Sequence, residues 1–293
     1  MTHKAGFVNI LGAPNAGKST LMNALTGERL SIITPKAQTT RHRILGIVNG
    51  DDYQIVFSDT PGVITPKYPL QESMMEYVNT AIEDGDVYLW VVTRDDTRED
   101  ANHTGKLLHD QIPLIIALNK VDLSDQASVE RDIAHWSDMF PEASIIPISA
   151  LYGFNLDWLK ARILDLLPES PPYFDKEELT DRNLRFFVSE IIREKILLHY
   201  QQEIPYSAEV IIDDFIEDRL LVRIYATIVV SRESQKAIII GNAGKAIKRL
   251  GIEARRSIEG FLDQKVHLEL KVKVIKDWRD NPKQLRWFGY NPL

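Results

Sequence analysis

The sequence predicts an α/β fold: a phosphate-binding-loop domain with a mixed, mostly parallel sheet, followed by a smaller α+β domain. A glycine-rich loop at residues 12–19 lies between an apolar run and a helical pattern, which is the context that such a loop requires. Further apolar runs end in polar motifs, as parallel strands do when their loops share one sheet edge. A proline-rich, acidic stretch then precedes a second set of strand and helix patterns. At 293 residues, two domains are the ordinary expectation.

The glycine-rich loop reads Gly-Ala-Pro-Asn-Ala-Gly-Lys-Ser and fits the pattern Gly, four residues, Gly-Lys-Ser. Residues 7–11 before it form an apolar run, and residues 20–25 after it begin a helix. The glycines let backbone N–H groups gather around phosphate oxygens, and the helix N-terminus adds its positive end. We therefore expect Lys18 to reach the outer phosphates and the Ser19 hydroxyl to bind Mg²⁺.

A polar loop at residues 30–38 follows the first helix and ends in Gln-Thr-Thr-Arg at residues 38–41. Two apolar runs, 44–48 and 54–58, then flank an Asn-Gly-Asp-Asp hairpin signal, which predicts one antiparallel edge strand. The second run delivers Asp-Thr-Pro-Gly at residues 59–62. Its carboxylate can hold Mg²⁺, and its glycine N–H can approach a terminal phosphate. Alone, the motif fits a simple Pro-Gly turn equally well.

Two later strand ends carry candidate base-binding motifs. The run at 114–118 ends in Asn119-Lys120-Val121-Asp122, and the run at 144–148 ends in Ser149-Ala150-Leu151. The Asp122 carboxylate can accept two N–H bonds from guanine, and adenine offers neither donor. Asn119 would brace its loop, the Lys120 stem would cover the base, and a backbone N–H near Ala150 would reach the guanine carbonyl oxygen. Each motif alone also fits an ordinary polar loop. Asn155 is expected to cap the next helix.

The order of these motifs resembles the translation-factor-related GTPases, and the resemblance covers residues 5–168. It implies GTP and GDP as ligands with Mg²⁺, and two mobile switches at residues 30–42 and 59–75. Ser19, Asp59 and the switch threonine Thr40 would hold the metal, while Lys18, Thr40 and Gly62 would be catalytic. The implied nucleotide-binding residues are Gly12, Ala13, Pro14, Asn15, Ala16, Gly17, Lys18, Ser19, Thr20, Asp59, Thr60, Pro61, Gly62, Val63, Asn119, Lys120, Val121, Asp122, Ser149, Ala150 and Leu151.

One residue departs from the Ras-like pattern. Val63 follows the Asp-Thr-Pro-Gly motif where a Ras-like protein has a glutamine that orients water. A valine neither donates to nor accepts from water, so we expect slow intrinsic hydrolysis, helped by a partner or a monovalent cation. Asn15 has a side-chain oxygen close to where K⁺ bridges the phosphates in some similar GTPases. It fits an ordinary turn residue equally well.

Composition predicts a linker over residues 169–182, which separates a domain at 1–168 from one at 183–293. The second domain begins with an amphipathic helix at 184–200. Strand patterns follow at 208–212, 220–230 and 266–274. Between the last two lie helices hinged at Gly241-Asn242-Ala243-Gly244. The tail at 276–288 interleaves basic and aromatic residues, which can stack on bases or pack back on the domain.

The resulting order of helix, strand, strand, helix, Gly-x-x-Gly, helix and strand resembles a type II KH domain, which binds RNA. The two glycines would let a nucleic-acid backbone approach the helix ends, with bases on the adjoining apolar groove. Basic residues gather here on a chain of net charge −7, with Glu253 the only acid among them. A solvated helix face is the alternative. The candidate RNA-binding residues are Lys236, Gly241, Asn242, Ala243, Gly244, Lys245, Lys248 and Arg249.

Composition and charge exclude several classes of protein and of binding site. A net charge of −7 excludes a globally basic nucleic-acid binder, and the lack of cysteine excludes disulfides, thiolate metal sites and thiol catalysis. Residues 1–6 lead directly into the first strand without a signal-peptide pattern, and no apolar run is long enough to span a bilayer. We therefore expect a cytoplasmic protein.

As a whole, the sequence resembles the Era family of GTPases. The resemblance implies a monomeric switch that binds 16S rRNA near its 3′ end, acts in assembly of the small ribosomal subunit, and partly associates with the inner face of the plasma membrane. Two alternatives remain open. The second domain can be a protein adaptor that binds no RNA, or the first can be a nucleotide-locked, non-hydrolysing domain on an RNA-binding protein.

Overall fold

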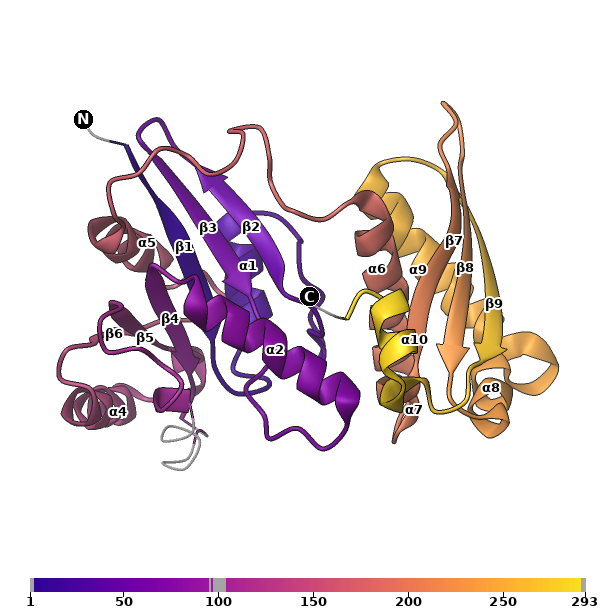
Figure 1. The fold of residues 1–293 in the computed structure, drawn as a ribbon, viewed down its shortest axis with the longest axis horizontal. Coiled ribbons are helices and arrows are strands. Elements are labelled where there is room, and N and C mark those ends of the chain that lie inside the picture. The colour runs from indigo at the N-terminus through magenta and orange to yellow at the C-terminus, as the bar shows by residue number, and fades with distance from the viewer. Residues whose placement is uncertain (1–2, 95, 97–103, 291–293) are drawn as a thin grey trace. The chain divides into compact units, whose positions relative to one another are not determined.

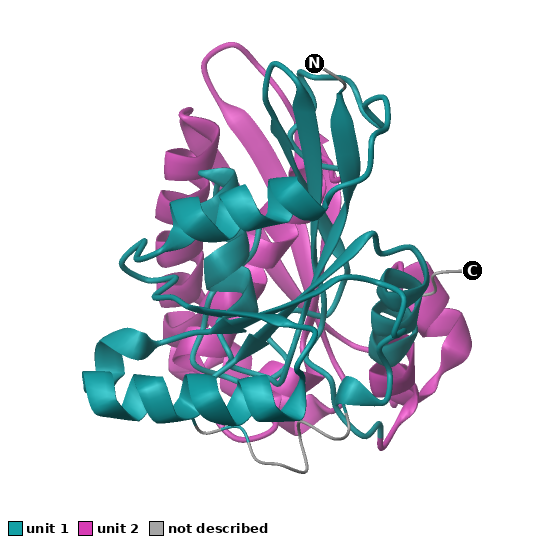
Figure 2. Cartoon of the chain, turned by 90° about the vertical axis from the view of Figure 1, so that its left-hand side faces the viewer, with its two compact units in different colours: residues 1–66, 74–181 teal, residues 67–73, 182–293 magenta. Residues whose placement is uncertain are grey.

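The computed structural model describes residues 3–94, 96 and 104–290 and has the fold class that the sequence predicts. Contacts divide the chain into two compact units, residues 1–66 with 74–181 and residues 67–73 with 182–293 (Figure 2). In the part of the chain that is described, no helix combines the length and apolar character needed to cross a membrane.

The first unit is built on a six-stranded sheet in the order β2-β3-β1-β4-β5-β6 (Figure 1). Only β2 is antiparallel to its neighbour, and it pairs with β3 through the predicted hairpin, which is confirmed. Every residue of β4, Val-Tyr-Leu-Trp-Val-Val, is buried, as expected for a central parallel strand. The strands are β1 (Lys4–Leu11), β2 (Ile44–Asn49), β3 (Tyr53–Asp59), β4 (Val87–Val92), β5 (Leu114–Leu118) and β6 (Ser144–Pro147).

Helices α1 (Lys18–Thr26), α2 (Pro69–Glu83), α4 (Gln126–Met139) and α5 (Leu156–Leu166) accompany this sheet. Tyr88 of β4 packs with α2, and Trp90, two residues later on the same face, packs with α4. The carboxyl ends of β1, β3 and β5 therefore lie at one sheet edge, where the phosphate loop and the Asp59 and Asn119 motifs follow.

Asn155 is the N-cap residue of α5, as predicted, but its side chain does not make the hydrogen bond that such a residue usually makes to the helix. The Asn155 backbone is left-handed, with φ of 59°. The side-chain amide instead donates to the Pro147 carbonyl oxygen at 2.9 Å, which ties the loop to the end of β6.

The stretch for which composition predicts a linker is hydrogen-bonded to the first unit through residue 181. On the edge strand β2, the Ile47 N–H donates to the Leu179 carbonyl at 2.9 Å and the Leu45 N–H donates to the Asp181 carboxylate at 3.0 Å. The Gln54 amide donates to the Phe174 carbonyl at 2.9 Å. The segment thus covers an edge that would otherwise expose unpaired backbone groups. The domain boundaries taken from composition stay predictions.

The second unit has a three-stranded sheet in the order β7-β8-β9, with β7 antiparallel and β9 parallel to β8. One sheet face packs against helices through a core that includes Ile192, Leu250 and Ile258. The other face is wet, since alternate residues of β9 are exposed. The elements are α6 (Leu184–His199), α7 (Ile204–Ser207), β7 (Glu209–Ile216), β8 (Val222–Val230), α8 (Glu233–Ile240), α9 (Lys245–Leu262), β9 (Val266–Val274) and α10 (Pro282–Trp287).

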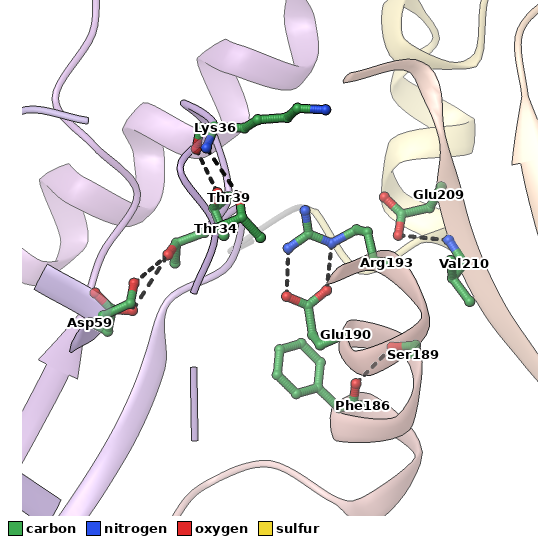
Figure 3. Close-up of polar contacts among 12 residues, drawn as sticks. Thr34, Lys36, Thr39, Asp59, Phe186, Ser189, Glu190, Arg193, Glu209 and Val210 are labelled. Carbon is green, nitrogen blue, oxygen red and sulfur yellow. Dashed lines mark hydrogen bonds and ion pairs between the residues drawn. The ribbon is translucent and has the colours of Figure 1, made fainter. Parts of the chain in front are cut away.

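Helix α6 begins where its sequence provides a cap. The Asn183 side chain accepts a hydrogen bond from the Phe186 N–H at 3.0 Å. Within the first turns, Ser189 donates to the Phe186 carbonyl, and Glu190 forms a two-bonded ion pair with Arg193 (Figure 3). A charged pair that is almost fully buried needs such geometry, because either group alone would be left desolvated.

The tail at residues 276–288 packs back on the second unit. Its buried residues are therefore part of the domain core and are not available to stack on bases. Trp278 is fully buried and its indole N–H donates to the Ser207 carbonyl at 2.9 Å. Leu285 and Tyr290 are also buried, and the Tyr290 hydroxyl bonds to Glu209. Trp287 differs, because 62% of it is exposed.

We expect Trp278→Ala to destabilise the second unit by about 3–5 kcal/mol, because it leaves a large cavity and an unpaired Ser207 carbonyl. Trp287→Ala is the matched control and should change the free energy of unfolding by less than about 0.5 kcal/mol. Urea unfolding followed by circular dichroism measures both. Equal effects of the two substitutions would contradict the burial assignment.

Candidate nucleotide-binding and nucleic-acid-binding sites

The phosphate loop joins β1 to α1 through two glycines with positive φ, 141° at Gly12 and 101° at Gly17. A Cβ at Gly12 would collide with the Val91 carbonyl oxygen, and one at Gly17 would collide with the Asn119 side-chain amide. Both positions therefore need glycine for the backbone angle and for the close approach. Residues of this loop and the first residues of α1 line one cavity together: Pro14, Asn15, Gly17, Lys18, Ser19 and Thr20.

Lys18 is buried against this loop. Its ammonium group donates to the carbonyl oxygens of Gly12 and Ala13 at 3.0 and 2.8 Å. Burial lowers the pKa of Lys18 to about 8, although the nearby carboxylates of Asp59 and Asp96 oppose the shift. A cation held this way gains from any anionic ligand that enters the loop.

Three oxygen-bearing side chains from separate elements meet beside Lys18. The Ser19 hydroxyl donates to Asp59 Oδ2 at 2.7 Å and lies 2.8 Å from the Thr40 hydroxyl, which is 3.4 Å from the same Asp59 oxygen. Asp59, the last residue of β3, is labelled in Figure 3. Burial raises the pKa of Asp59, and the Ser19 hydrogen bond and the Lys18 charge oppose that rise.

The second carboxylate oxygen, Asp59 Oδ1, is buried and has no hydrogen-bond partner in the described part of the chain. An orphaned carboxylate oxygen is costly unless a ligand completes its shell. Together with the Ser19 and Thr40 hydroxyls it forms an all-oxygen set of the kind that Mg²⁺ prefers. The predicted metal ligands are therefore adjacent and chemically suited to that ion.

A cavity of 320 Å³ opens over this cluster, large enough for a small ligand. One wall is the phosphate loop, another is the segment from Ile32 to Thr40, and Gly62 and Lys120 complete it. Within that segment, the Thr39 hydroxyl bonds to Thr34 and to the Lys36 carbonyl, at 2.7 and 2.6 Å (Figure 3). The predicted first switch thus covers the site in a folded conformation.

The segment at residues 30–42, which the sequence predicts to be the first switch, is tethered at its beginning by Asn23 of α1. The Asn23 side-chain oxygen accepts the N–H groups of Leu30 and Ser31 at 3.0 and 2.9 Å. Its amide donates to the Ser31 carbonyl at 2.7 Å. Sequence reasoning missed this residue, although an asparagine at helical spacing from Ser19 is a detectable signal.

Arg43 tethers the other end of the switch. Its guanidinium bonds to both Asp84 carboxylate oxygens at 2.6 and 2.9 Å, to Ser58 at 2.6 Å and to Asn9 at 3.2 Å. A planar guanidinium suits such fork geometry better than a lysine would. No sequence pattern pointed to Arg43, because Asp84 lies 41 residues away in the chain.

Gly62 and Val63 have different surroundings. A Cβ at Gly62 would lie 2.8 Å from the Pro14 nitrogen, so only glycine fits beside the phosphate loop. The Val63 N–H donates to the Gly12 carbonyl at 3.1 Å, whereas its side chain packs in the core with Leu11 and Val78. Val63 therefore contributes backbone to this region and points no side chain at a phosphate.

The two base-binding motifs form one hydrogen-bonded network. The Asn119 amide donates to the Ala16 carbonyl at 2.8 Å, and its oxygen accepts the Ala150 N–H at 3.0 Å. The Ser149 hydroxyl donates to the Asp122 carboxylate at 2.5 Å. Asn119 thus braces both loops against the phosphate loop, as predicted from its position. Asp122 is exposed.

The remaining predicted residues divide by their position. The cavity is lined by Pro14, Asn15, Gly17, Lys18, Ser19, Thr20, Thr40, Gly62 and Lys120. The other predicted nucleotide-binding residues do not line this cavity. Thr60, for example, is buried and donates to the Ile10 carbonyl at 2.8 Å. Asn15 is exposed with φ of 64°, so a turn role and a cation role both stay open.

The Gly-x-x-Gly tetrad of the second unit joins α8 to α9 with positive φ at Gly241, Ala243 and Gly244. A Cβ at Gly241 would lie 3.1 Å from the Ala246 nitrogen, whereas a Cβ at Gly244 would meet no atom within 4 Å. Gly244 therefore presents open backbone at the start of α9. Such a surface admits a phosphodiester chain to a helix N-terminus.

Basic side chains border the tetrad. Lys245 and Arg249 line a cavity of 360 Å³ together with Asn242, and Lys248 joins them at a neighbouring one. Lys236 lies on α8 instead and lines neither of these cavities. The structure thus places three of the four predicted basic residues on one stretch of α9.

Comparison with known proteins gives matches to both units. The family described as "50S ribosome-binding GTPase" matches residues 7–120, and the family described as "KH domain" matches residues 203–279. GTPase Era of Geotalea daltonii is 43% identical over 289 residues, covering 98% of this chain and 97% of that protein. GTPase Era of Caldicellulosiruptor saccharolyticus is 43% identical and covers 99% of each chain.

Solved structures agree with this match. A crystal structure of Era in complex with MgGDPNP and nucleotides 1506–1542 of 16S ribosomal RNA superposes with a TM-score of 0.94, at 40% identity over 99% of both chains. A variant of Aquifex aeolicus Era bound to GDP·AlF₄⁻ gives the same TM-score and identity, over 98% of this chain and 99% of that one.

The lowered pKa of Lys18 predicts how nucleotide affinity depends on pH. Phosphate binding needs the protonated amine, and the free protein loses that proton above about pH 8. The affinity for Mg-GDP should therefore fall about fourfold between pH 7.0 and 8.5. Titration calorimetry measures it. Lys18→Met should bind weakly with no such decline, and a wild-type affinity that is constant over this range would contradict the assignment.

Proposed function

The chain belongs to the Era family of GTPases, and from that premise we propose that it is a GTP-controlled switch that binds 16S rRNA during assembly of the small ribosomal subunit. It is a GTPase with a C-terminal KH domain. The observation that carries the proposal is that one chain holds both a phosphate loop and an open Gly244 backbone beside basic residues.

In the first unit, the nucleotide phosphates would enter the cavity over the phosphate loop. Ser19, Thr40 and Asp59 would hold Mg²⁺, which would neutralise charge developing on the phosphate oxygens. Lys18 would exchange its two backbone carbonyl partners for phosphate oxygens. The Era structure with MgGDPNP supports this choice of ligands.

Hydrolysis would depend on position and charge. The Gly62 N–H would approach the terminal phosphate, since no side chain blocks it. The buried Val63 side chain would not orient water, so intrinsic turnover would be slow. For guanine, Asp122 would accept two N–H bonds while Asn119 holds the surrounding loops.

The switch would work through the tethered segment between Ser31 and Arg43. With GTP bound, Thr40 would stay in the metal site, and after hydrolysis the segment would be released. This change would alter access to the KH groove. The complex of Era with 16S rRNA nucleotides supports an rRNA ligand for the KH domain.

Three finer expectations stay proposals: K⁺ at Asn15, peripheral contact with the plasma membrane from the cytoplasmic side, and a monomeric state. The first has a direct observation behind it, the exposed left-handed Asn15 in the phosphate loop. A rate of GTP hydrolysis that is the same in sodium and in potassium would contradict the proposed K⁺ site at Asn15.

Two rival functions would change the proposal. If the second unit is a protein adaptor, nucleotide binding survives but RNA binding is absent. If the first unit only locks a nucleotide, RNA binding survives but phosphate release is absent. The basic side chains of Lys245, Lys248 and Arg249 beside the open backbone at Gly244 favour RNA binding, because they attract phosphate groups.

Gly244→Asp tests the RNA-binding half. It places a carboxylate where the phosphodiester chain would lie, so the affinity for a ten-nucleotide RNA copied from the 3′ end of 16S rRNA should fall about tenfold or more. Gly260→Asp is the control, since it adds the same charge on α9 where a Cβ also meets open space. GDP affinity should stay unchanged in both.

Fluorescence anisotropy of the labelled RNA measures these affinities. An equal loss of RNA affinity in both variants would mean that the added negative charge acts through net charge alone and not through its position. RNA binding that Gly244→Asp leaves intact would contradict the proposed site.

A further inference from the structure

A carboxylate joins two helices beside the tetrad. Glu253 of α9 lies 2.6 Å from the Nε2 atom of His199, the last residue of α6. Its other oxygen accepts a hydrogen bond from Arg249 Nε, one turn earlier on α9, at 3.1 Å. Glu253 therefore has a partner on each of its two oxygens.

The surroundings of Glu253 are basic. The cavity of 360 Å³ next to it is lined by His199, Lys245 and Arg249, and a neighbouring cavity adds Lys248 and Arg256. The cavity also has an apolar boundary in the buried Leu250. An acid at this place neutralises the arginine nearest to the open backbone of Gly244.

The two side chains of the pair reach water. Arg249 is 73% exposed and Glu253 is 37% exposed, so the pair can separate without burying a lone charge. Exposed pairs of this kind contribute little to stability, so their separation costs little. A phosphate offers the same guanidinium a ligand of equal charge sign and similar geometry.

We propose that Glu253 is an internal substitute for a nucleic-acid phosphate: it binds Arg249 and His199 in the free protein, and a phosphate of single-stranded RNA displaces it. This inference rests on the proposed RNA binding. Arg249 and His199 then form a phosphate subsite on the α6 side of the tetrad, and Glu253 sets how strongly a ligand must compete for it.

The ionisation of Glu253 agrees with this role. The Arg249 hydrogen bond is the main cause that holds the pKa of Glu253 below its usual value. Burial opposes it, and the His199 hydrogen bond and the charges of His199 and Arg249 lower the pKa further. Glu253 is therefore a carboxylate at neutral pH, which is the form that competes with phosphate. Displacement removes both hydrogen bonds and brings a phosphate near, so RNA should raise this pKa.

Glu253→Gln tests the proposal because it removes the competing charge and keeps the side-chain shape. Its affinity for the ten-nucleotide RNA should rise about threefold to tenfold. The slope of log affinity against log salt concentration should steepen by about 0.7, the value for one added phosphate contact on a single strand. In an Arg249→Gln background the gain should disappear.

The matched control is Glu269→Gln on β9, where an exposed glutamate lies 3.5 Å from Lys271. It makes the same change in net charge, and we expect no more than a small effect on RNA affinity. An equal gain in both variants would mean that only net charge acts. Weaker binding by Glu253→Gln would mean that Glu253 positions Arg249 for RNA, and either result overturns the proposal.

A second measurement separates this inference from the proposed function. The carboxyl chemical shift of Glu253, titrated by NMR with and without the RNA, should show a higher pKa in the complex. Binding with an unchanged pKa would overturn the displacement while leaving RNA binding intact. No binding by the wild type or by Glu253→Gln would overturn the RNA-binding function itself, and the proposal with it.

Discussion

The hydrogen bonds that Ser19 makes with Asp59 and Thr40 are the constraint on which the first unit depends. They join the start of α1, the end of β3 and the first switch at one point. That meeting is possible because β3 and β1 are parallel neighbours, so their carboxyl ends open on the same edge. Among the described residues, Asp59 Oδ1 is buried and has no hydrogen-bond partner, so the point where these elements meet has room for a further ligand.

The tethers on the switch limit what can move. Asn23 holds residues 30 and 31, and Arg43 is held by Asp84, Ser58 and Asn9. Any rearrangement is thus confined to the segment between these anchors. The segment between these anchors, residues 32–42, contains Thr40, which lies in the cluster with Ser19 and Asp59. The second unit also has a contact that a ligand can replace, since Glu253 binds Arg249 until a phosphate takes its place.

Much of this was predictable from the sequence, for physical reasons that differ by element. Local sequence is enough to predict the strands, because they are apolar runs bounded by turn residues. It is also enough to predict the hairpin and the phosphate loop, because their turns need particular residues such as glycine. Arg43 and Asp84 were missed because their pairing depends on tertiary structure. The side-chain cap expected of Asn155 does not form, because its amide donates to the Pro147 carbonyl at the end of β6 instead of bonding to the helix. Composition could not decide whether the tail packs on the domain or stays free to stack on bases. Trp278 and Trp287 have similar neighbours in the sequence, yet only Trp278 is buried.

The central claim is that nucleotide state controls RNA access, and one measurement tests it most directly. The affinity for a short single-stranded segment from the 3′ end of 16S rRNA is measured with the protein saturated by a non-hydrolysable GTP analogue and then by GDP, each with Mg²⁺. The account predicts clearly tighter binding with the GTP analogue, by about tenfold if the two states differ by about 1.4 kcal/mol. Identical affinities would contradict it, because a ligand that binds both states equally shifts neither.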